Sequence, residues 1–197
     1  MSGFNYRKAV QALNFFAVHE GGSINKMKAI KLVWLSNRDH LRRYGRPIFN
    51  DIYYAMKFGP VPSNTKDLAE LDSEFLASEE LEYRDLFIKP LDKHSFTSSN
   101  DVDFNVFSET DTKSLETTYN NFGDYTQYDL SELSHQFPEW KKFEKSINMG
   151  LGSRFEINIA DFFKQIDSET ENLFKMDEED LSLSKEAYEE REELELI

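Results

Sequence analysis

The chain carries its strongest local signals in the stretch Tyr44-Gly-Arg-Pro-Ile-Phe-Asn-Asp-Ile-Tyr-Tyr-Ala-Met-Lys-Phe-Gly-Pro-Val-Pro-Ser63. Gly45 follows a long helical pattern and favours the left-handed conformation that ends a helix, and Pro47 blocks its continuation. Asn50 is a residue type that caps helices, which predicts a further helical turn that contains Tyr53. This half of the stretch therefore predicts two helical segments with a sharp stop between them.

The second half of the stretch predicts an extended crossing followed by a new helix. Gly59 closes the preceding turn, and Pro60 and Pro62 exclude helix across the residue between them. Ser63 is a favourable N-cap, and the residues after it are compatible with helix. On the glycines and prolines alone, the stretch is interpreted as a rigid connector between helices.

The same stretch also resembles the signature of a known family. Tyr44-Gly-Arg-Pro47, followed by Ala55-Met-Lys-Phe-Gly-Pro-Val-Pro-Ser63, is similar to the motif of the Panacea, or SocA-like, antitoxin family. Members of this family carry a Lys- and Leu-rich helix before the motif, which residues 28–35 match. They also carry a Leu-Ser-His element downstream, which Leu133-Ser-His135 matches.

The resemblance has one departure and implies a function. The family usually carries Leu-Gln-Lys-Leu-Leu-Tyr in the helix before the motif, where this chain has Ala29-Ile-Lys-Leu-Val-Trp34, so the pattern is kept while most residues differ. The similarity spans residues 5–145 and implies an antitoxin that neutralises a cognate toxin by direct protein contact. Some members of the family are phage-associated, and the known partners include toxic small alarmone synthetases. One relative is an adaptor that delivers its toxin to a protease.

The composition predicts one folded domain with an acidic appendix. The chain has 197 residues, of which 39% are hydrophobic, and 17 Phe and 9 Tyr are enough to build a core. The sequence has no run of 18 apolar residues and no signal-peptide pattern, so no membrane partner is expected. Cysteine is absent. This excludes disulfides, cysteine nucleophiles and thiolate metal sites, and it fits a cytoplasmic protein.

Charge is distributed very unevenly along the chain. Residues 1–66 hold 11 Lys and Arg against three acids, while the whole chain has a net charge of −14. The last segment, residues 176–197, holds 10 acids and two bases. Since nucleic-acid-binding proteins normally have a basic body, the acidic balance argues against nucleic acid as the main partner.

Apolar spacing predicts several helices and one hairpin. Residues 5–19 and 24–44 have helical periodicity and are separated by Gly21-Gly-Ser23. A third helix follows the prolines and is marked by Leu68, Leu71 and Phe75. Residues 85–91 and 102–106 have the pattern of strands, and the polar residues 94–100 between them predict a loop. We therefore expect an antiparallel hairpin, or wing, in this region.

The second half of the chain carries clear helix starts. Ser108-Glu-Thr-Asp111 has the form of a capping box, and the helix that it opens is expected to stop at Gly123. Further helical segments are predicted to begin at Thr126, at Pro138 and near Ile159. The predicted fold is mainly α within the α+β class: a compact helical domain with one small antiparallel hairpin and a helical, acidic C-terminal extension. We assign residues 1–150 to the Panacea-like domain, 151–176 to a helical extension and 177–197 to an acidic tail.

Four cations lie on one side of the second predicted helix. At about 100° per residue, they fall within a stripe about 80° wide beside the apolar arc. The stripe consists of Lys28, Lys31, Arg38 and Arg42. It is either solvated, with pairing to the acidic half of the chain as one form of this, or it binds an acidic partner surface or a phosphate-bearing ligand. Our hypothesis is that this stripe, or the acidic tail 177–197, forms part of the toxin contact.

The sequence contains no recognisable catalytic or metal-binding pattern. None of the four histidines has the spacing of a zinc site, and phosphate-binding glycine loops and a nucleophile elbow are absent. Ser134 and His135 are neighbours, so on a helix they point about 100° apart and do not face each other. We expect no enzyme activity, no cofactor and no metal. His135 is predicted to be structural, with its ring nitrogens bonded to backbone or buried polar groups. The other family-motif residues expected to be structural are Gly45, Pro47, Gly59, Pro60 and Pro62.

Alternatives of other classes stay open. Two helices followed by a hairpin resemble the order of a winged helix, which predicts a transcriptional regulator, although the supposed recognition helix is half covered by its apolar arc. An enzyme with a small polar substrate would be indicated by turnover that depends on His135. The acidic tail is either solvated, or a helix around Leu181–Ile197 in which Leu194, Leu196 and Ile197 dock onto a partner or onto the basic third of the chain. Assembly with itself or with a toxin is also left open.

Overall fold

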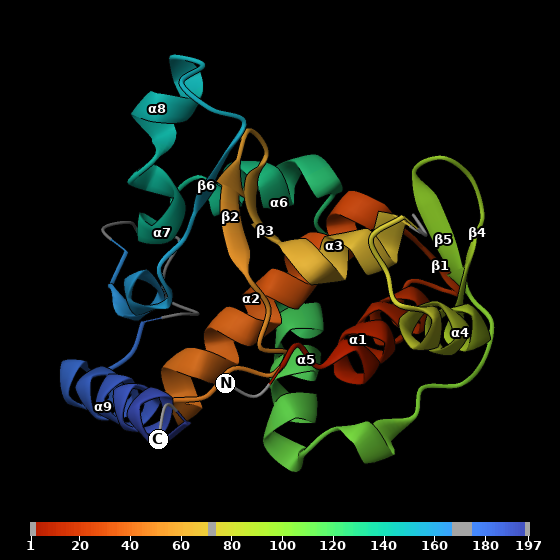
Figure 1. Ribbon diagram of the computed structural model, residues 1–197, viewed down its shortest axis with the longest axis horizontal. Coiled ribbons are helices and arrows are strands. Elements are labelled where there is room, and N and C mark those ends of the chain that lie inside the picture. The colour runs from red at the N-terminus through yellow and green to blue at the C-terminus, as the bar shows by residue number, and fades with distance from the viewer. Residues whose placement is uncertain (1–2, 71–73, 167–174, 196–197) are drawn as a thin grey trace.

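One long helix runs through the middle of the molecule, and the other elements are arranged around it (Figure 1). The computed structural model describes residues 3–70, 74–166 and 175–195. The central helix, α2, spans Lys26–Tyr44, and every residue from Lys28 to Arg42 is buried. Burial on all sides follows from its neighbours, since α2 contacts helices from both halves of the chain.

The elements follow one another in a fixed order along the chain. The other α-helices are α1 (Tyr6–His19), α3 (Ser63–Glu70), α4 (Ser78–Phe87), α5 (Glu109–Phe122), α6 (Gln127–Ser134), α7 (Pro138–Lys141), α8 (Glu144–Asn148) and α9 (Glu178–Glu195). In the part of the chain that the structure describes, the short 3-10 helices are η1 (Phe104–Val106) and η2 (Ile159–Phe163). The strands are β1 (Ser23–Asn25), β2 (Tyr53–Met56), β3 (Gly59–Pro62), β4 (Ile88–Pro90), β5 (Ser95–Ser98) and β6 (Arg154–Glu156).

The strands form two antiparallel sheets of three strands each, with the orders β1-β5-β4 and β3-β2-β6. The predicted class, mainly α with a small β part, is therefore confirmed, although the β part is larger than one hairpin. Among the described residues, no helix is both long and apolar enough to cross a membrane.

Local signals set both ends of α2, but only the C-terminal one was predicted, because the expected start at Gly21-Gly-Ser23 is followed by β1 and the cap is Asn25. The Asn25 side chain accepts hydrogen bonds from the N–H groups of Met27 and Lys28 and so caps the start of the helix. Gly45 has a φ of 59° and donates its N–H to Leu41 O, which ends the helix in the left-handed conformation.

The middle of the motif stretch is a strand rather than the predicted helical turn. Asn50 has a φ of 51°, so it turns the chain instead of capping a helix. Tyr53 and Ala55 are buried and the residues between and after them are partly exposed, which is the alternation of a half-buried strand. Pro60 and Pro62 lie on β3, an edge strand of its sheet, where the missing N–H groups are tolerated.

The predicted wing is present, but its second strand lies elsewhere in the chain. Residues 88–90 form β4 as expected, whereas residues 85–87 end α4 and residues 104–106 form η1. The second strand is β5, within the segment predicted as a loop. Its only buried side chain is Phe96, which pairs with Ile24 of β1. That pairing joins residues far apart in sequence, so no local pattern reveals it.

The helix starts of the second half are confirmed. Ser108 and Asp111 form the capping box of α5, Thr126 and Asp129 form that of α6, and Pro138 opens α7. Near Ile159 the chain forms η2 rather than a longer α-helix. The predicted third helix, α3, ends at Glu70. Leu71 lies outside the described residues, and Phe75 is 70% exposed in the turn before α4.

The acidic C-terminal segment forms α9, which packs against the C-terminal half of α2 and against η2 (Figure 1). Of the two alternatives left open for this segment, a solvated tail or a docked helix, the structure has a helix docked onto the basic third of the chain, but not through Leu194. Leu181 is buried, and the ring of Tyr188 packs on that of Phe163 with their centroids 5.9 Å apart. Leu194, in contrast, is 73% exposed. Leu196 and Ile197 lie outside the described residues. The boundaries predicted at residues 150 and 176 stay predictions, and β6 pairs with β2 across the first of them.

Candidate functional site

The three segments that carry the family resemblance meet at the turn of the β2–β3 hairpin. Lys31 of α2 donates a hydrogen bond of 2.7 Å from Nζ to Pro60 O. Ser131 Oγ of α6 donates to Phe58 O at 3.0 Å, and Trp140 Nε1 of α7 donates to Met56 O at 2.7 Å. Three helices therefore hold the main chain of one turn.

Gly59 is the residue that allows the turn to lie so close to these helices. Its φ is 100°, a backbone conformation that residues other than glycine rarely adopt. A Cβ atom at this position would overlap Ser134 Oγ and would lie 2.6 Å from Lys31 Nζ. The turn is thus in direct contact with both the α2 lysine and the Leu-Ser-His element.

Lys31 is an unusual residue for the interior. Its side chain is 1% exposed, and burial lowers the pKa of its ammonium group well below the ordinary value. No carboxylate of the described residues forms an ion pair with it, and a main-chain carbonyl is its hydrogen-bond acceptor. The charged form of Lys31 is therefore poorly stabilised where it lies.

The Leu-Ser-His element packs beneath the turn without forming a nucleophile–base pair. Ser134 Oγ donates a hydrogen bond of 2.7 Å to Ser131 O. The His135 ring stacks on Trp140, with centroids 3.9 Å apart and planes inclined by 20°. Burial and the nearby Lys31 lower the pKa of His135, while a hydrogen bond with the Lys57 backbone raises it. His135 Nε2 has no hydrogen-bond partner within the described part of the chain, so only part of the expected bonding is present.

The turn presents apolar side chains to solvent. Phe58 is 54% exposed, and Lys57 Nζ lies 5.7 Å from the centroid of its ring. Tyr128, on α6 and one turn before Ser131, is 64% exposed. Because Arg154 of β6 pairs with Met56, the loop before β6 lies beside the turn and adds further exposed residues. We call the tip surface the set Lys57, Phe58, Tyr128, Met149 and Leu151.

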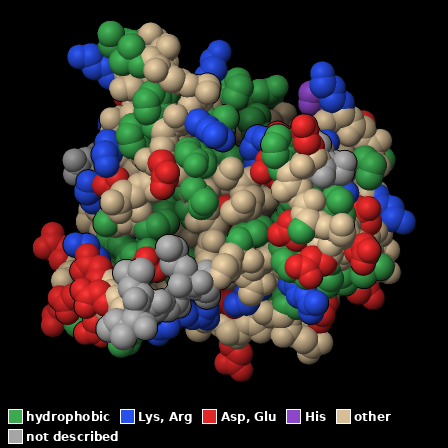
Figure 2. Space-filling view, in the orientation of Figure 1, with side chains coloured by type: hydrophobic (Ala, Val, Ile, Leu, Met, Phe, Trp, Pro, Cys, Tyr) green, Lys and Arg blue, Asp and Glu red, His purple; other side chains and the backbone are tan. Residues whose placement is uncertain are grey.

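Figure 2 shows hydrophobic side chains along the upper edge of the molecule, where Figure 1 places the hairpin turn, α6 and the end of α8. They lie in separate groups with Lys or Arg side chains between them, and a surface that mixes exposed apolar groups with a polar surround is typical of interaction sites. Sequence reasoning missed this surface. The signal was available, because Lys57-Phe58 separates two short β-compatible runs as a two-residue hairpin connection does.

The cationic stripe of α2 is buried, so the expectation that its four side chains are solvated is wrong, whereas the alternative of pairing with the acidic half of the chain is met at Arg38. Lys28 is 8% exposed and pairs with Glu20 at 2.7 Å. Arg38 pairs with Glu139 of α7 at 2.8 Å, with both side chains fully buried. Arg42 donates two hydrogen bonds of 2.8 Å to main-chain oxygens at the end of η2. A role of these residues, or of Lys31, in toxin binding stays a prediction and requires them to leave these contacts.

The Arg38–Glu139 pair joins two of the segments at the site. The Arg38 guanidinium also lies over the Phe137 ring, 4.5 Å from its centroid. Burial raises the pKa of Glu139, and the attraction of Arg38 opposes this effect. The pair thus anchors α7, which in turn carries the Trp140 side chain that bonds the hairpin.

The remaining motif residues lie at the other end of α2. After Gly45, Arg46 and Lys8 both pair with Asp111 of α5, at 2.9 and 2.6 Å. The His40 ring lies 3.2 Å from the same carboxylate, and burial lowers the pKa of His40 to about 4. Within the described ranges, no three His, Cys, Asp or Glu side chains gather as they would around a metal ion.

Comparison of the chain with known proteins gave a match to a protein family. No curated protein and no solved structure is significantly similar to the chain. The model of the protein family described as "Antitoxin SocA-like, Panacea domain" matches residues 30–141. The matched range runs from α2 to α7 and contains every segment that holds the hairpin turn. Since it covers more than half of the chain, the protein belongs to the SocA-like antitoxin family defined by the Panacea domain.

Proposed function

We propose that this protein neutralises a cognate protein toxin in the cytoplasm by direct binding, and that the tip surface is part of the contact. The observation that carries the proposal is the convergence of the family-signature segments on one exposed turn. Lys31, Ser131 and Trp140 use their hydrogen-bonding groups to hold main-chain atoms of that turn, while Phe58 points away from them into solvent.

The tip surface has the physical properties of a binding site for a protein. Aromatic side chains and methionine are enriched where interfaces bury their central contacts. A turn held by three helices has little conformational entropy left to lose on binding, which favours affinity. Phe58 and Tyr128 supply the aromatic groups, and Met149 and Leu151 supply flexible apolar groups beside them.

The charge of the molecule favours a basic partner. The net charge is −14, and α9 presents most of its acidic side chains to solvent. Opposite charge accelerates encounter and discriminates against acidic partners. A toxin that acts on nucleotides, such as a small alarmone synthetase, has a basic substrate site that an acidic flank complements. Contact by residues 177–197 is therefore retained in the proposal as a secondary element.

A transcriptional regulator is less compatible with the structure. The helix that would have to read DNA is α2, and the four cations of its stripe are buried in ion pairs and hydrogen bonds. We therefore do not propose DNA binding. Delivery of the toxin to a protease is a variant of the same contact, and the amount of toxin in rescued cells distinguishes it from simple occlusion.

Co-expression with the product of the neighbouring gene tests the proposal. We expect that protein to arrest growth, the chain to restore growth, and the two to co-purify. Phe58→Ala is expected to weaken co-purification at least tenfold, while Phe75→Ala, an exposed phenylalanine outside the tip surface, leaves it unchanged. Absence of rescue would reject the antitoxin function. Rescue with equal binding by both variants would remove the tip surface from the contact.

A further inference from the structure

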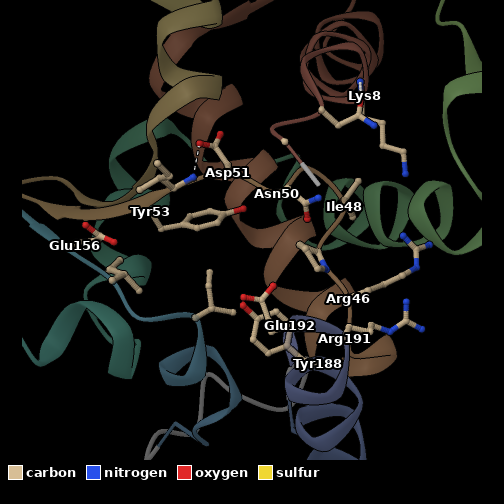
Figure 3. A pocket seen from close by; sticks show the side chains of 16 residues that line it. Lys8, Arg46, Ile48, Asn50, Asp51, Tyr53, Glu156, Tyr188, Arg191 and Glu192 are labelled. Atoms are coloured by element: carbon tan, nitrogen blue, oxygen red, sulfur yellow. Dashed lines mark hydrogen bonds between the residues drawn. The ribbon is translucent and has the colours of Figure 1, made fainter. Parts of the chain in front are cut away.

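A second feature, away from the tip surface, is a pocket of about 560 Å³ beneath α9 (Figure 3). Its walls come from the N-terminal segment, the chain between α2 and β2, the β6–η2 segment and α9. Pockets of this size hold small molecules. We propose that it binds a phosphorylated sugar, either free or as the ribose phosphate of a nucleotide.

Tyr53 provides the first argument. Its side chain is 1% exposed, and in Figure 3 its hydroxyl group points into the pocket. The hydroxyl has no hydrogen-bond partner in the part of the chain that the structure describes. A buried hydroxyl without a partner is costly, and a ligand oxygen at this position would remove that cost. Burial raises the pKa of Tyr53 well above its ordinary value, so the phenol keeps its proton and can donate it.

Cations on one side of the pocket provide the second argument. Figure 3 shows the charged ends of Lys8, Arg46 and Arg191 on the same side. Lys8 and Arg46 share one carboxylate, that of Asp111, which neutralises only one of their two charges. Arg191 adds a third cation from α9. The Arg46 guanidinium also donates to Ser108 and Thr110. Arg191, which forms no ion pair within the described residues, is therefore the cation best placed to bind a phosphate, and guanidinium groups bind phosphate oxygens in a bidentate manner.

The centre of the pocket is polar but not cationic. Glu192 and Asn50 lie in Figure 3 across the open space from Tyr53, with Ile48 and Tyr188 as apolar walls. Two further carboxylates, Asp51 and Glu156, line the pocket on the side away from the cations, so an anionic group is accommodated only at the cationic side. A carboxylate repels a phosphate but accepts hydrogen bonds from sugar hydroxyl groups. The arrangement therefore suits a ligand with an anionic end at the cations and a neutral hydroxylated body at Tyr53 and Glu192.

The pocket depends on α9, which supplies Tyr188, Arg191 and Glu192. The proposed ligand consequently binds only when α9 is docked, and binding stabilises that position by linkage. This inference does not rest on the antitoxin function, because no residue of the tip surface lines the pocket.

Binding of ribose 5-phosphate, AMP, ribose and inorganic phosphate to the full chain tests the inference. Isothermal titration calorimetry and thermal unfolding are the two measurements. We expect ribose 5-phosphate or AMP to bind at least tenfold more tightly than ribose or phosphate and to raise the unfolding temperature. Tighter binding of AMP than of ribose 5-phosphate identifies a nucleotide, and equal binding identifies the sugar phosphate.

Three variants complete the test. Tyr53→Phe and Arg191→Gln are each expected to weaken binding at least tenfold, whereas Lys185→Gln, also on α9 but outside the pocket, leaves it unchanged. Tyr53→Phe should not lower the stability of the free protein, since its hydroxyl has no partner to lose. The inference is overturned if no probe binds at millimolar concentration. It is equally overturned if phosphate alone binds as well as the sugar phosphate, or if Tyr53→Phe and Arg191→Gln bind as the natural chain does.

Discussion

Lys31 Nζ, in the middle of the central helix, donates a hydrogen bond of 2.7 Å to the main-chain oxygen of Pro60 in the hairpin. This bond joins the core of the molecule to its most exposed turn through a cation that has no carboxylate partner among the described residues. The positions of α2 and of the hairpin turn are therefore coupled, because Pro60 O would lose its hydrogen-bond donor if one of these two elements shifted without the other.

The first prediction concerns the contact of Gly59 with its neighbours. In Gly59→Ala the new methyl group overlaps Ser134 Oγ and the backbone keeps an unfavourable positive φ, so the free energy of unfolding should fall by about 3 kcal/mol or more. Gly150→Ala is the matched control. It also has a positive φ, but no atom lies within 4 Å of its added Cβ, and a loss of about 1 kcal/mol is expected. Equal losses in urea unfolding would show that the turn does not lie on Ser134.

The second prediction concerns the ionisation of Lys31. Burial lowers the pKa of Lys31 in the folded state, while in the unfolded chain it keeps its ordinary pKa of 10.5. At pH values between the folded and the unfolded pKa, the unfolded chain binds more protons, so the stability of the fold rises with pH. Lys31→Met removes this contribution. The stability of the natural chain relative to the variant should therefore increase with pH up to about pH 10.5, by at most about 1.4 kcal/mol per pH unit. A difference that stays constant with pH would contradict the prediction.

The third prediction concerns His40, whose pKa burial lowers from 6.5 to about 4 despite the nearby Asp111 and Asp39. Above about pH 6.5 the neutral ring is present in both states and its contribution to stability is complete. As the pH falls toward about 4, the unfolded chain takes up the proton first, and about 3 kcal/mol is lost. His40→Gln should reduce this loss in urea unfolding. An unchanged acid dependence in the variant would assign the effect to other groups.

The fourth prediction concerns the contact of Gly45 with α9. A Cβ atom on Gly45 would lie 2.5 Å from Ser184 O and 2.9 Å from Ala187 Cβ. Gly45→Ala should therefore destabilise the full chain by about 3 kcal/mol, of which only about 1 kcal/mol, the conformational part, remains when the chain is truncated after Met176. The two unfolding free energies in each background measure this difference. Equal costs would mean that α9 does not pack on Gly45 in solution.

The fifth prediction returns to the stripe of α2. Arg38→Glu would place a second carboxylate beside Glu139 in the interior, so a loss of about 3–5 kcal/mol or more is expected from thermal unfolding. Arg43→Gln is the control, since the Arg43 side chain is 41% exposed although its partner Asp39 is buried, and a smaller loss of about 1 kcal/mol is expected from a half-exposed pair. A folded Arg38→Glu variant that specifically fails to bind toxin would restore the original hypothesis for this residue.

Signals that act over a few residues identified much of the fold in advance. Gly45 ends α2, the Ser108 and Thr126 capping boxes open α5 and α6, and Pro138 opens α7. Each of these depends on backbone groups within one turn of the residue, so the nearby sequence contains all the necessary information. The family signature likewise identified the residues of the hairpin turn, though not their conformation.

Tertiary structure alone decided where these residues lie and what they contact. The sequence by itself determined that Lys31 and Arg38 share one side of α2, but not that this side is covered. Their partners are Pro60 and Glu139, the second of which is about a hundred positions away, and helical periodicity describes only one helix at a time. In the same way, β5 is a strand because Phe96 pairs with Ile24, and Tyr53 faces a pocket because α9 returns from the end of the chain. Burial is a property of the assembled chain, so only the tertiary structure decides which of these side chains are covered and which are exposed.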